Sequence, residues 1–163
     1  MVSLAEIICM GVFSTFFMDA LGRILVKLKI VRPALEAYIL GRWVLYFIKG
    51  KYVHEDIHQT PALKNERNVA LISHYLIGIV LIGIYIFLET KIAVLRTQIW
   101  IPIIFGVTTV LLPWLWLYPS IGFGLLASKA KNKLDFIIFS IINHLNFGIG
   151  MTIWIVFFRQ FFI

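Results

Sequence analysis

The sequence contains little charge for its length. Only 14% of its 163 residues are charged, whereas 61% are apolar and the mean hydropathy is +0.93. An ordinary soluble domain has about 25% charged and about 45–50% apolar residues. A soluble core cannot hold this excess of apolar side chains, so the composition predicts a single domain, residues 1–163, that folds within a lipid bilayer.

Cysteine is almost absent, and so are basic residues near the N-terminus. Cys9 is the only cysteine, which excludes an intramolecular disulfide and a metal site built from several cysteines. The first basic residue is Arg23, behind an apolar stretch that already carries Glu6 and Asp19. A secretory signal peptide has a basic start and an uninterrupted apolar run. We therefore interpret this stretch as a retained transmembrane helix.

Apolar residues gather in four long stretches, at about 4–26, 69–88, 99–127 and 134–162. A helix needs roughly 20 residues to cross a hydrocarbon core of about 30 Å. The sequence thus predicts an all-α polytopic membrane protein with four transmembrane helices. The third stretch is too long for one straight crossing, and Pro113 and Pro119 predict a kink or a break in it.

The distribution of basic residues predicts how these helices are oriented. Nine of the fifteen Lys and Arg residues lie in the segment 23–67, and Lys129, Lys131 and Lys133 lie between the third and fourth stretches. Loops rich in Lys and Arg stay in the cytoplasm. We therefore expect both loops inside and both termini outside. The net charge of +7 then reflects topology and requires no nucleic-acid partner.

A shorter apolar segment lies within the first basic loop, which covers about 27–68. Residues 34–48 are too few to span a bilayer, and they include Glu36 and Arg42. We predict an amphipathic helix on the cytoplasmic membrane surface, with Trp43 and Tyr46 at headgroup level. The basic residues of this loop would attract anionic lipid headgroups, by roughly 1 kcal/mol each near the surface, or dock an acidic protein partner.

Residues 54–58 read His-Glu-Asp-Ile-His, the HExxH spelling of zinc metalloproteases. In that chemistry a helix places two histidines on one face to hold the metal, and the glutamate activates water. Here Gly50 and Pro61 enclose the motif in a short polar loop, and no spacing requires the candidate third ligand, Glu66. We interpret the motif as a solvated loop with no catalytic role. A metal contact through His54 and His58 is the alternative.

Polar residues inside the apolar stretches are candidates for function because they are costly in hydrocarbon. At a rise of 1.5 Å per residue, several of them fall at similar depth in the cytoplasmic half of the membrane. We predict that five residues form a ligand-binding layer: Asp19, His74, Tyr118, Asn143 and His144. Each histidine is followed four residues later by a glycine, which would let a helix or a flat cofactor approach the imidazole.

Several interpretations of this layer are open. The polar groups can bond to one another across helices and serve only the fold. They can instead bind a small ligand, an ion or a proton, or His74 and His144 can hold a b-type haem as axial ligands. A membrane adaptor, a small subunit or a homo-oligomer without a site of its own is a further class, favoured by the small size of the chain.

Four motifs give the sequence a family resemblance: "GRW" at 41–43, "TPALKNERNVALISHYLIG" at 60–78, "YPSIGFGLLASKAKN" at 118–132 and "NHLNFGIGM" at 143–151. With them the chain resembles the DUF2938 family of small, uncharacterised bacterial inner-membrane proteins. The resemblance implies a four-helix protein of the bacterial inner membrane and implies no activity, cofactor or substrate. The matching positions include Arg42, Glu66, His74, Pro119, Gly122, Ser128, Lys129, His144 and Gly148. Arg42 and Glu66 are therefore candidate polar positions on the cytoplasmic side.

Overall fold

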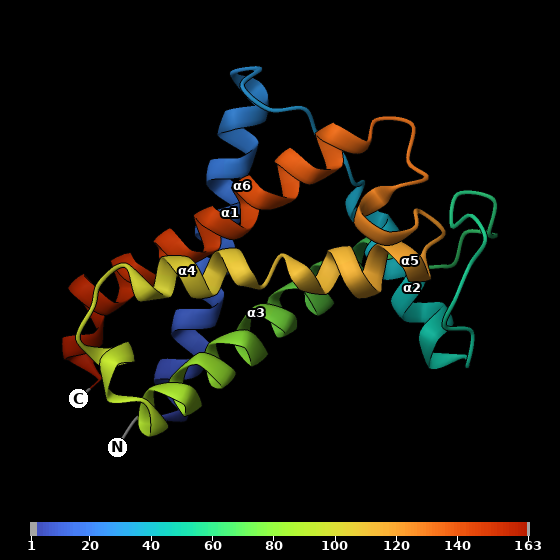
Figure 1. Ribbon diagram of the computed structural model, residues 1–163. Helices are drawn as coiled ribbons and strands as arrows, with labels where there is room; N and C mark the ends of the chain where they lie inside the picture. Colours follow the sequence, from blue (N-terminus) through green and yellow to red (C-terminus); the bar gives the residue numbers. More distant parts are fainter. Residues whose placement is uncertain (1–2, 163) are drawn as a thin grey trace.

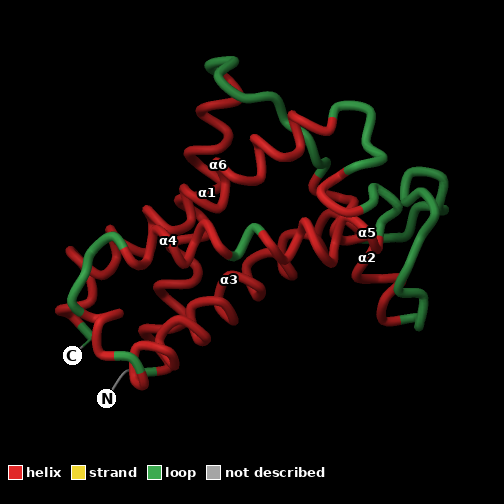
Figure 2. Tube along the Cα trace, in the orientation of Figure 1, coloured by secondary structure: helices red, strands yellow, loops and turns green. Residues whose placement is uncertain are grey.

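The computed structural model describes residues 3–162, which form helices and loops and contain no strand. Four helical segments are long and apolar enough to cross a membrane: α1 (Leu4–Lys27), α3 (Glu66–Lys91), the third span Ile101–Ser120 and the fourth span Lys133–Phe161. A shorter apolar helix, α2 (Ala37–Ile48), lies between α1 and α3 (Figures 1 and 2). The predicted all-α class, with four spans and one short helix, is confirmed.

The third span is the least regular of the four. It consists of α4 (Ile101–Thr108), a π-helical turn η2 (Pro113–Leu117) and the short helix α5 (Tyr118–Ser120). The regular helix α4 ends at Thr108 and is followed by a turn at residues 109–110, and Pro113, which has no amide hydrogen, makes no helix bond back to Thr109. The span ends at Ser120, short of the expected 127, because Gly122 and Gly124 turn the chain with φ of 93° and 72°.

The remaining helical turns connect or extend the spans. The 3-10 turns η1 (Ala93–Arg96) and η3 (Leu125–Ala127) follow α3 and α5. The fourth span comprises α6 (Lys133–Ile153), a π-helical turn η4 (Trp154–Phe158) and the 3-10 turn η5 (Arg159–Phe161).

The spans form a bundle whose two ends differ. The start of α1, the turn after α3 and the end of the fourth span lie at one end, here called the terminal end (Figure 1). Helices α2 and α5 lie toward the other, the loop end. Within the bundle, α1 packs against α3 and α6, α4 packs against α6, and α2 packs against α3.

Glycines allow the closest of these helix contacts. A Cβ atom at Gly148 would lie 2.7 Å from a backbone Cα of α4, and one at Gly78 would collide with the Thr15 hydroxyl of α1. Only glycine permits backbones to approach this closely. The glycines that follow His74 and His144 by four residues therefore serve helix packing.

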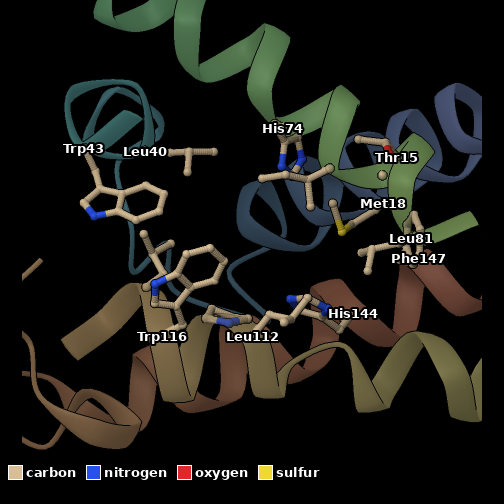
Figure 3. A pocket seen from close by; sticks show the side chains of 14 residues that line it. Thr15, Met18, Leu40, Trp43, His74, Leu81, Leu112, Trp116, His144 and Phe147 are labelled. Carbon is tan, nitrogen blue, oxygen red and sulfur yellow. The ribbon is translucent and has the colours of Figure 1, made fainter. Parts of the chain in front are cut away.

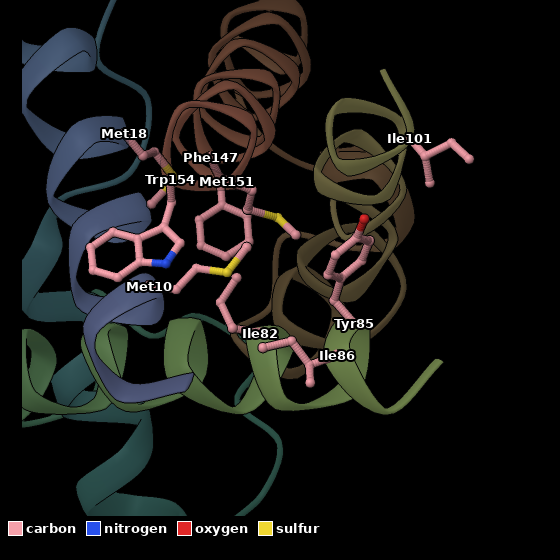
Figure 4. Close-up of a cluster of buried hydrophobic side chains, with 9 residues drawn as sticks. All are labelled: Met10, Met18, Ile82, Tyr85, Ile86, Ile101, Phe147, Met151 and Trp154. Atoms are coloured by element: carbon pink, nitrogen blue, oxygen red, sulfur yellow. The ribbon is translucent and has the colours of Figure 1, made fainter. Parts of the chain in front are cut away.

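Two clusters of buried side chains hold the bundle together. The terminal cluster joins α1, α3, the start of α4 and the fourth span, and contains Met10, Met18, Ile82, Tyr85, Ile86, Ile101, Phe147, Met151 and Trp154 (Figure 4). The loop cluster joins α2 to the loop that follows it and to the turn after the third span, and contains Ile39, Trp43, Ile57, Tyr118, Ile121, Phe123 and Ala127. The buried apolar side chains thus form one cluster toward each end of the bundle, and a region of the bundle between the two clusters belongs to neither.

Candidate functional site

A pocket of about 220 Å³ lies between the two clusters. Its wall includes Met18 and Phe147 of the terminal cluster and Trp43 of the loop cluster, and all four spans and α2 contribute to it. Figure 3 shows His74 and His144 on opposite sides of this pocket. Apart from Thr15 and two indole nitrogens, the imidazoles are the only polar groups in a wall of otherwise apolar side chains.

The hydrogen bonds of His144 determine which of its ring nitrogens carries the hydrogen. Nδ1 lies 2.7 Å from the hydroxyl oxygen of Thr109, and this oxygen lies 2.6 Å from the carbonyl oxygen of Gly106. A hydroxyl has one hydrogen and a carbonyl can only accept, so Thr109 donates to Gly106 and Nδ1 of His144 donates to Thr109. The lone pair of the neutral imidazole is then on Nε2.

His74 is held in a similar way by Asp19 across the α1–α3 interface. Nε2 of His74 lies 3.1 Å from a carboxylate oxygen of Asp19. An ionised carboxylate only accepts, so Nε2 carries the hydrogen and Nδ1 is the remaining nitrogen. Within residues 3–162, no hydrogen bond reaches Nδ1 of His74 or Nε2 of His144. In each histidine, therefore, the hydrogen bond of one ring nitrogen fixes the orientation of the ring, and the other nitrogen has no partner among the described residues.

The pocket is open on one side. Its wall includes Ile77, Leu112 and Trp116, which are 43%, 44% and 56% exposed. All three residues belong to helices that are long and apolar enough to span a membrane. Apolar side chains exposed on such helices face hydrocarbon rather than water. The opening therefore leads to the side of the bundle that lipid would cover.

Two of the five residues predicted for the ligand-binding layer lie elsewhere. Tyr118 is buried in the loop cluster, where its ring packs edge-on against Phe136 with centroids 5.7 Å apart. Asn143 faces α1 beside Gly22, whose missing side chain leaves room for the Asn143 amide oxygen. The structure thus brings together Asp19, His74 and His144, and places Tyr118 and Asn143 outside the pocket.

Arg42 and Glu66 form a buried ion pair at the loop end. Nε and Nη2 of Arg42 donate to the two carboxylate oxygens of Glu66 at 2.7 and 3.0 Å. Nη1 donates to the carbonyl oxygens of Ile57 and Thr60 at 3.1 and 3.0 Å, and Glu66 also accepts from the amide of Leu63. The bonded carboxylate raises the pKa of Arg42 above its usual value. One guanidinium therefore fixes the loop after α2 to both α2 and α3.

The HExxH spelling lies in an irregular loop and not in a helix. His54 is 3% exposed, its Nδ1 lies 3.0 Å from the hydroxyl oxygen of Thr60, and its amide donates to Ser120. His58 lies on the outside, where its ring stacks on Phe123 with centroids 5.6 Å apart. Across residues 3–162 there is no group of three His, Cys, Asp or Glu side chains that could hold a metal ion. In this loop the two histidines occupy different environments instead of sharing one helix face.

An ion network at the terminal end is absent from the sequence-based expectations. Nε of Arg159 donates to Glu6 at 2.7 Å, and its two terminal nitrogens donate to both carboxylate oxygens of Glu89 at 3.1 and 3.0 Å. The network joins the beginning of α1, the end of α3 and the last turn of the fourth span. Its signal in the sequence was three charged residues in or beside apolar stretches.

A family model described as "Protein of unknown function (DUF2938)" matches residues 8–156, which is most of the chain. The chain belongs to this family. The match includes every residue that lines the pocket, together with Arg42 and Glu66. Searches of curated proteins and of solved structures found no match. The resemblance noted in the sequence is confirmed, and the description of the family supplies no activity to carry over.

Proposed function

We propose that this protein binds a small, lipid-soluble ligand in the pocket between His74 and His144, within the bacterial inner membrane. The observation that carries the proposal is the pair of oriented imidazoles in an otherwise apolar pocket. Ligand sites are commonly concave and apolar with a few placed polar groups. A carboxylate that accepts from one ring nitrogen fixes the orientation of an imidazole and leaves the other nitrogen for a ligand, as is usual for metal-binding histidines, and Asp19 holds His74 in this way.

The size of the pocket supports occupation over a purely structural role for the histidines. Cavities in protein cores cost roughly 24 cal/mol per Å³, so a closed, empty space of 220 Å³ would cost about 5 kcal/mol. This pocket opens toward lipid, so an apolar molecule from the bilayer can fill it. A plain acyl chain would leave two imidazole nitrogens without partners, whereas a ligand with polar groups satisfies them.

A b-type haem held by His74 and His144 is the second candidate, favoured by the same two oriented imidazoles. The helix contact of Gly148 weighs against it, because the backbone of α4 at Pro102 and Ile103 fills the space beside this glycine, one turn from His144. An absorption spectrum of the purified protein separates the candidates. A strong haem band that disappears in His144→Ala would replace the proposal with this one, whereas a protein without visible absorption agrees with a colourless ligand.

The test of the proposal uses an apolar aromatic probe, naphthalene, and a pair of matched tryptophan variants. Leu81→Trp fills the pocket, whereas Leu71→Trp adds the same side chain on the exposed face of α3, where Leu71 is 58% exposed. We expect saturable binding of naphthalene to the detergent-purified protein and to Leu71→Trp, and its loss in Leu81→Trp. Equal binding to all three proteins, or to none, would contradict the proposal.

We also propose that the loop end faces the cytoplasm and the terminal end the periplasm. Support comes from exposed basic residues near the loop end: Lys27, Lys29, Lys49, Lys51, Lys64, Lys129, Lys131 and Lys133. These residues would also attract anionic lipid headgroups or an acidic partner. After replacement of Cys9, which is exposed, a cysteine at position 94 should label from outside intact cells and one at position 131 should not. The reverse pattern would refute the orientation.

A further inference from the structure

We infer that the ligand is an aromatic alcohol of the hydroquinone class, which enters from the bilayer and donates hydroxyl hydrogens to the two imidazoles. The inference rests on the proposed function of the pocket and names the chemistry that this pocket selects. It follows from the hydrogen positions on the two rings, from the volume of the pocket and from the direction in which it opens.

His144 selects a ligand that donates a hydrogen bond. Because Thr109 fixes the hydrogen of His144 on Nδ1, the atom left over is Nε2, with a lone pair. A ligand carbonyl placed there would face this lone pair with another acceptor and would gain no bond. A hydroxyl, by contrast, donates to Nε2. The hydrogen bond from Thr109 to Gly106, at the end of α4, therefore makes His144 prefer a ligand hydroxyl over a ligand carbonyl.

His74 imposes the same preference from the opposite wall. Its Nε2–H is committed to Asp19, so Nδ1 is the ring nitrogen left to accept a hydrogen bond. Figure 3 shows the two imidazoles on opposite sides of the pocket. A flat ring with a hydroxyl at each end suits a pocket whose opposite walls each carry one histidine acceptor.

The volume and the remaining wall fit one substituted ring. An engineered apolar cavity of about 150 Å³ holds a benzene molecule, so a pocket of about 220 Å³ accommodates a ring with a few substituents. The indoles of Trp43 and Trp116 lie at one side, edge to face, with centroids 5.7 Å apart. Aromatic edges and faces of this kind pack well against a ligand ring.

The opening fits an alkyl tail on that ring. Ile77, Leu112 and Trp116 line the open side and are exposed on spanning helices. A tail that passes between α3 and the third span would stay in hydrocarbon while the hydroxyls are buried, so the ligand never has to cross water. Hydroquinones with alkyl tails have this distribution of polar and apolar atoms.

The experiment compares three ligands that share one ring and one short alkyl chain: the hydroquinone, its dimethyl ether and the corresponding quinone. Each competes with bound naphthalene under anaerobic conditions, which keep the hydroquinone reduced. We expect the hydroquinone to displace naphthalene at a concentration at least tenfold lower than the other two, since an unmade buried hydrogen bond weakens binding by about this factor or more.

Variants assign this preference to the histidine. In Thr109→Val the Nδ1 hydrogen of His144 loses its acceptor, and in His144→Leu one of the two acceptors for the ligand is removed. The preference for the hydroquinone should therefore shrink in both variants, and more in the second, while His74 keeps its own acceptor. His58→Gln, which changes a histidine outside the pocket, should keep it. Binding of naphthalene itself shows that each variant is folded.

The outcomes separate the two proposals. If naphthalene binds but the three ligands compete equally, or the quinone competes best, the hydroquinone class is wrong and the pocket stands. If the preference is unchanged in His144→Leu, the assignment of that preference to His144 is wrong. If naphthalene does not bind, or still binds in Leu81→Trp, the proposed function itself fails.

Discussion

Replacing Arg42 by Met tests how strongly one side chain holds the loop end together. Arg42 and Glu66 are each 8% exposed. Removing the guanidinium leaves the Glu66 carboxylate buried without its counter-ion, which typically costs about 3–5 kcal/mol. The carbonyl oxygens of Ile57 and Thr60 also lose their donor, but the loop lies near the surface and water can reach them after a small movement. We expect a loss of about 4 kcal/mol in the free energy of unfolding.

The measurement is equilibrium unfolding of the purified protein in mixed detergent micelles, followed by tryptophan fluorescence. The double variant Arg42→Met, Glu66→Leu removes both charges and should recover a large part of the loss, because no buried charge is left unpaired. Arg32→Met is the control, since the side chain of Arg32 is 82% exposed and lies 3.8 Å from Asp135. Such a surface ion pair contributes little to the free energy of unfolding. The reasoning is refuted if Arg42→Met unfolds like this control, or if the double variant loses the sum of both single changes.

Two further predictions concern the loop and the helix contacts. Burial, with a smaller effect of a nearby lysine, lowers the pKa of His54 from its usual value of 6.5, so the unfolded chain binds a proton more readily than the folded one. The stability that the neutral ring contributes is therefore complete above about pH 6.5 and is lost as the pH falls toward the lowered pKa. Between pH 8 and pH 5, the thermal unfolding midpoint should fall less in His54→Gln than in the control His58→Gln. Equal slopes of midpoint against pH in the two variants would contradict this. Gly148→Ala forces α4 and α6 apart and should lower the free energy of unfolding by about 1–3 kcal/mol in the same assay. In the control Gly83→Ala the new Cβ meets only one side-chain atom at 3.8 Å, so this variant should be as stable as the original protein or slightly more stable. Similar losses in both variants would show that the close approach of α4 and α6 does not matter.

Features that depend on local sequence were predictable. Apolar length and the absence of charge predict four spans, and the bounds of α1, which are Leu4–Lys27, agree with the expected 4–26 to within a residue or two. The third span differs because Gly122 and Gly124 have positive φ and stop the helix early. Those glycines were visible in the sequence, but the apolar residues that follow them extended the pattern beyond the real end.

Features that depend on pairing between distant residues were predictable only in part. Depth along the helices brought Asp19, His74 and His144 to one level, but depth does not specify which way a side chain faces, and Tyr118 turns into the loop cluster instead. Thr109, which orients His144, carries no signal of its own, since a threonine in an apolar stretch usually bonds only to its own helix. Its role is visible only once α4 lies beside α6.

The ion network of Arg159 with Glu6 and Glu89 can form only late in the synthesis of the chain. Arg159 follows Glu6 by 153 residues, so at about 5–20 residues per second the first span waits roughly 8–30 s for its counter-ion. A buried carboxylate without a counter-ion is costly, so the side chain of Glu6 has no reason to be buried during this interval. The bundle can therefore be closed at its terminal end only after synthesis has reached the last turn of the fourth span.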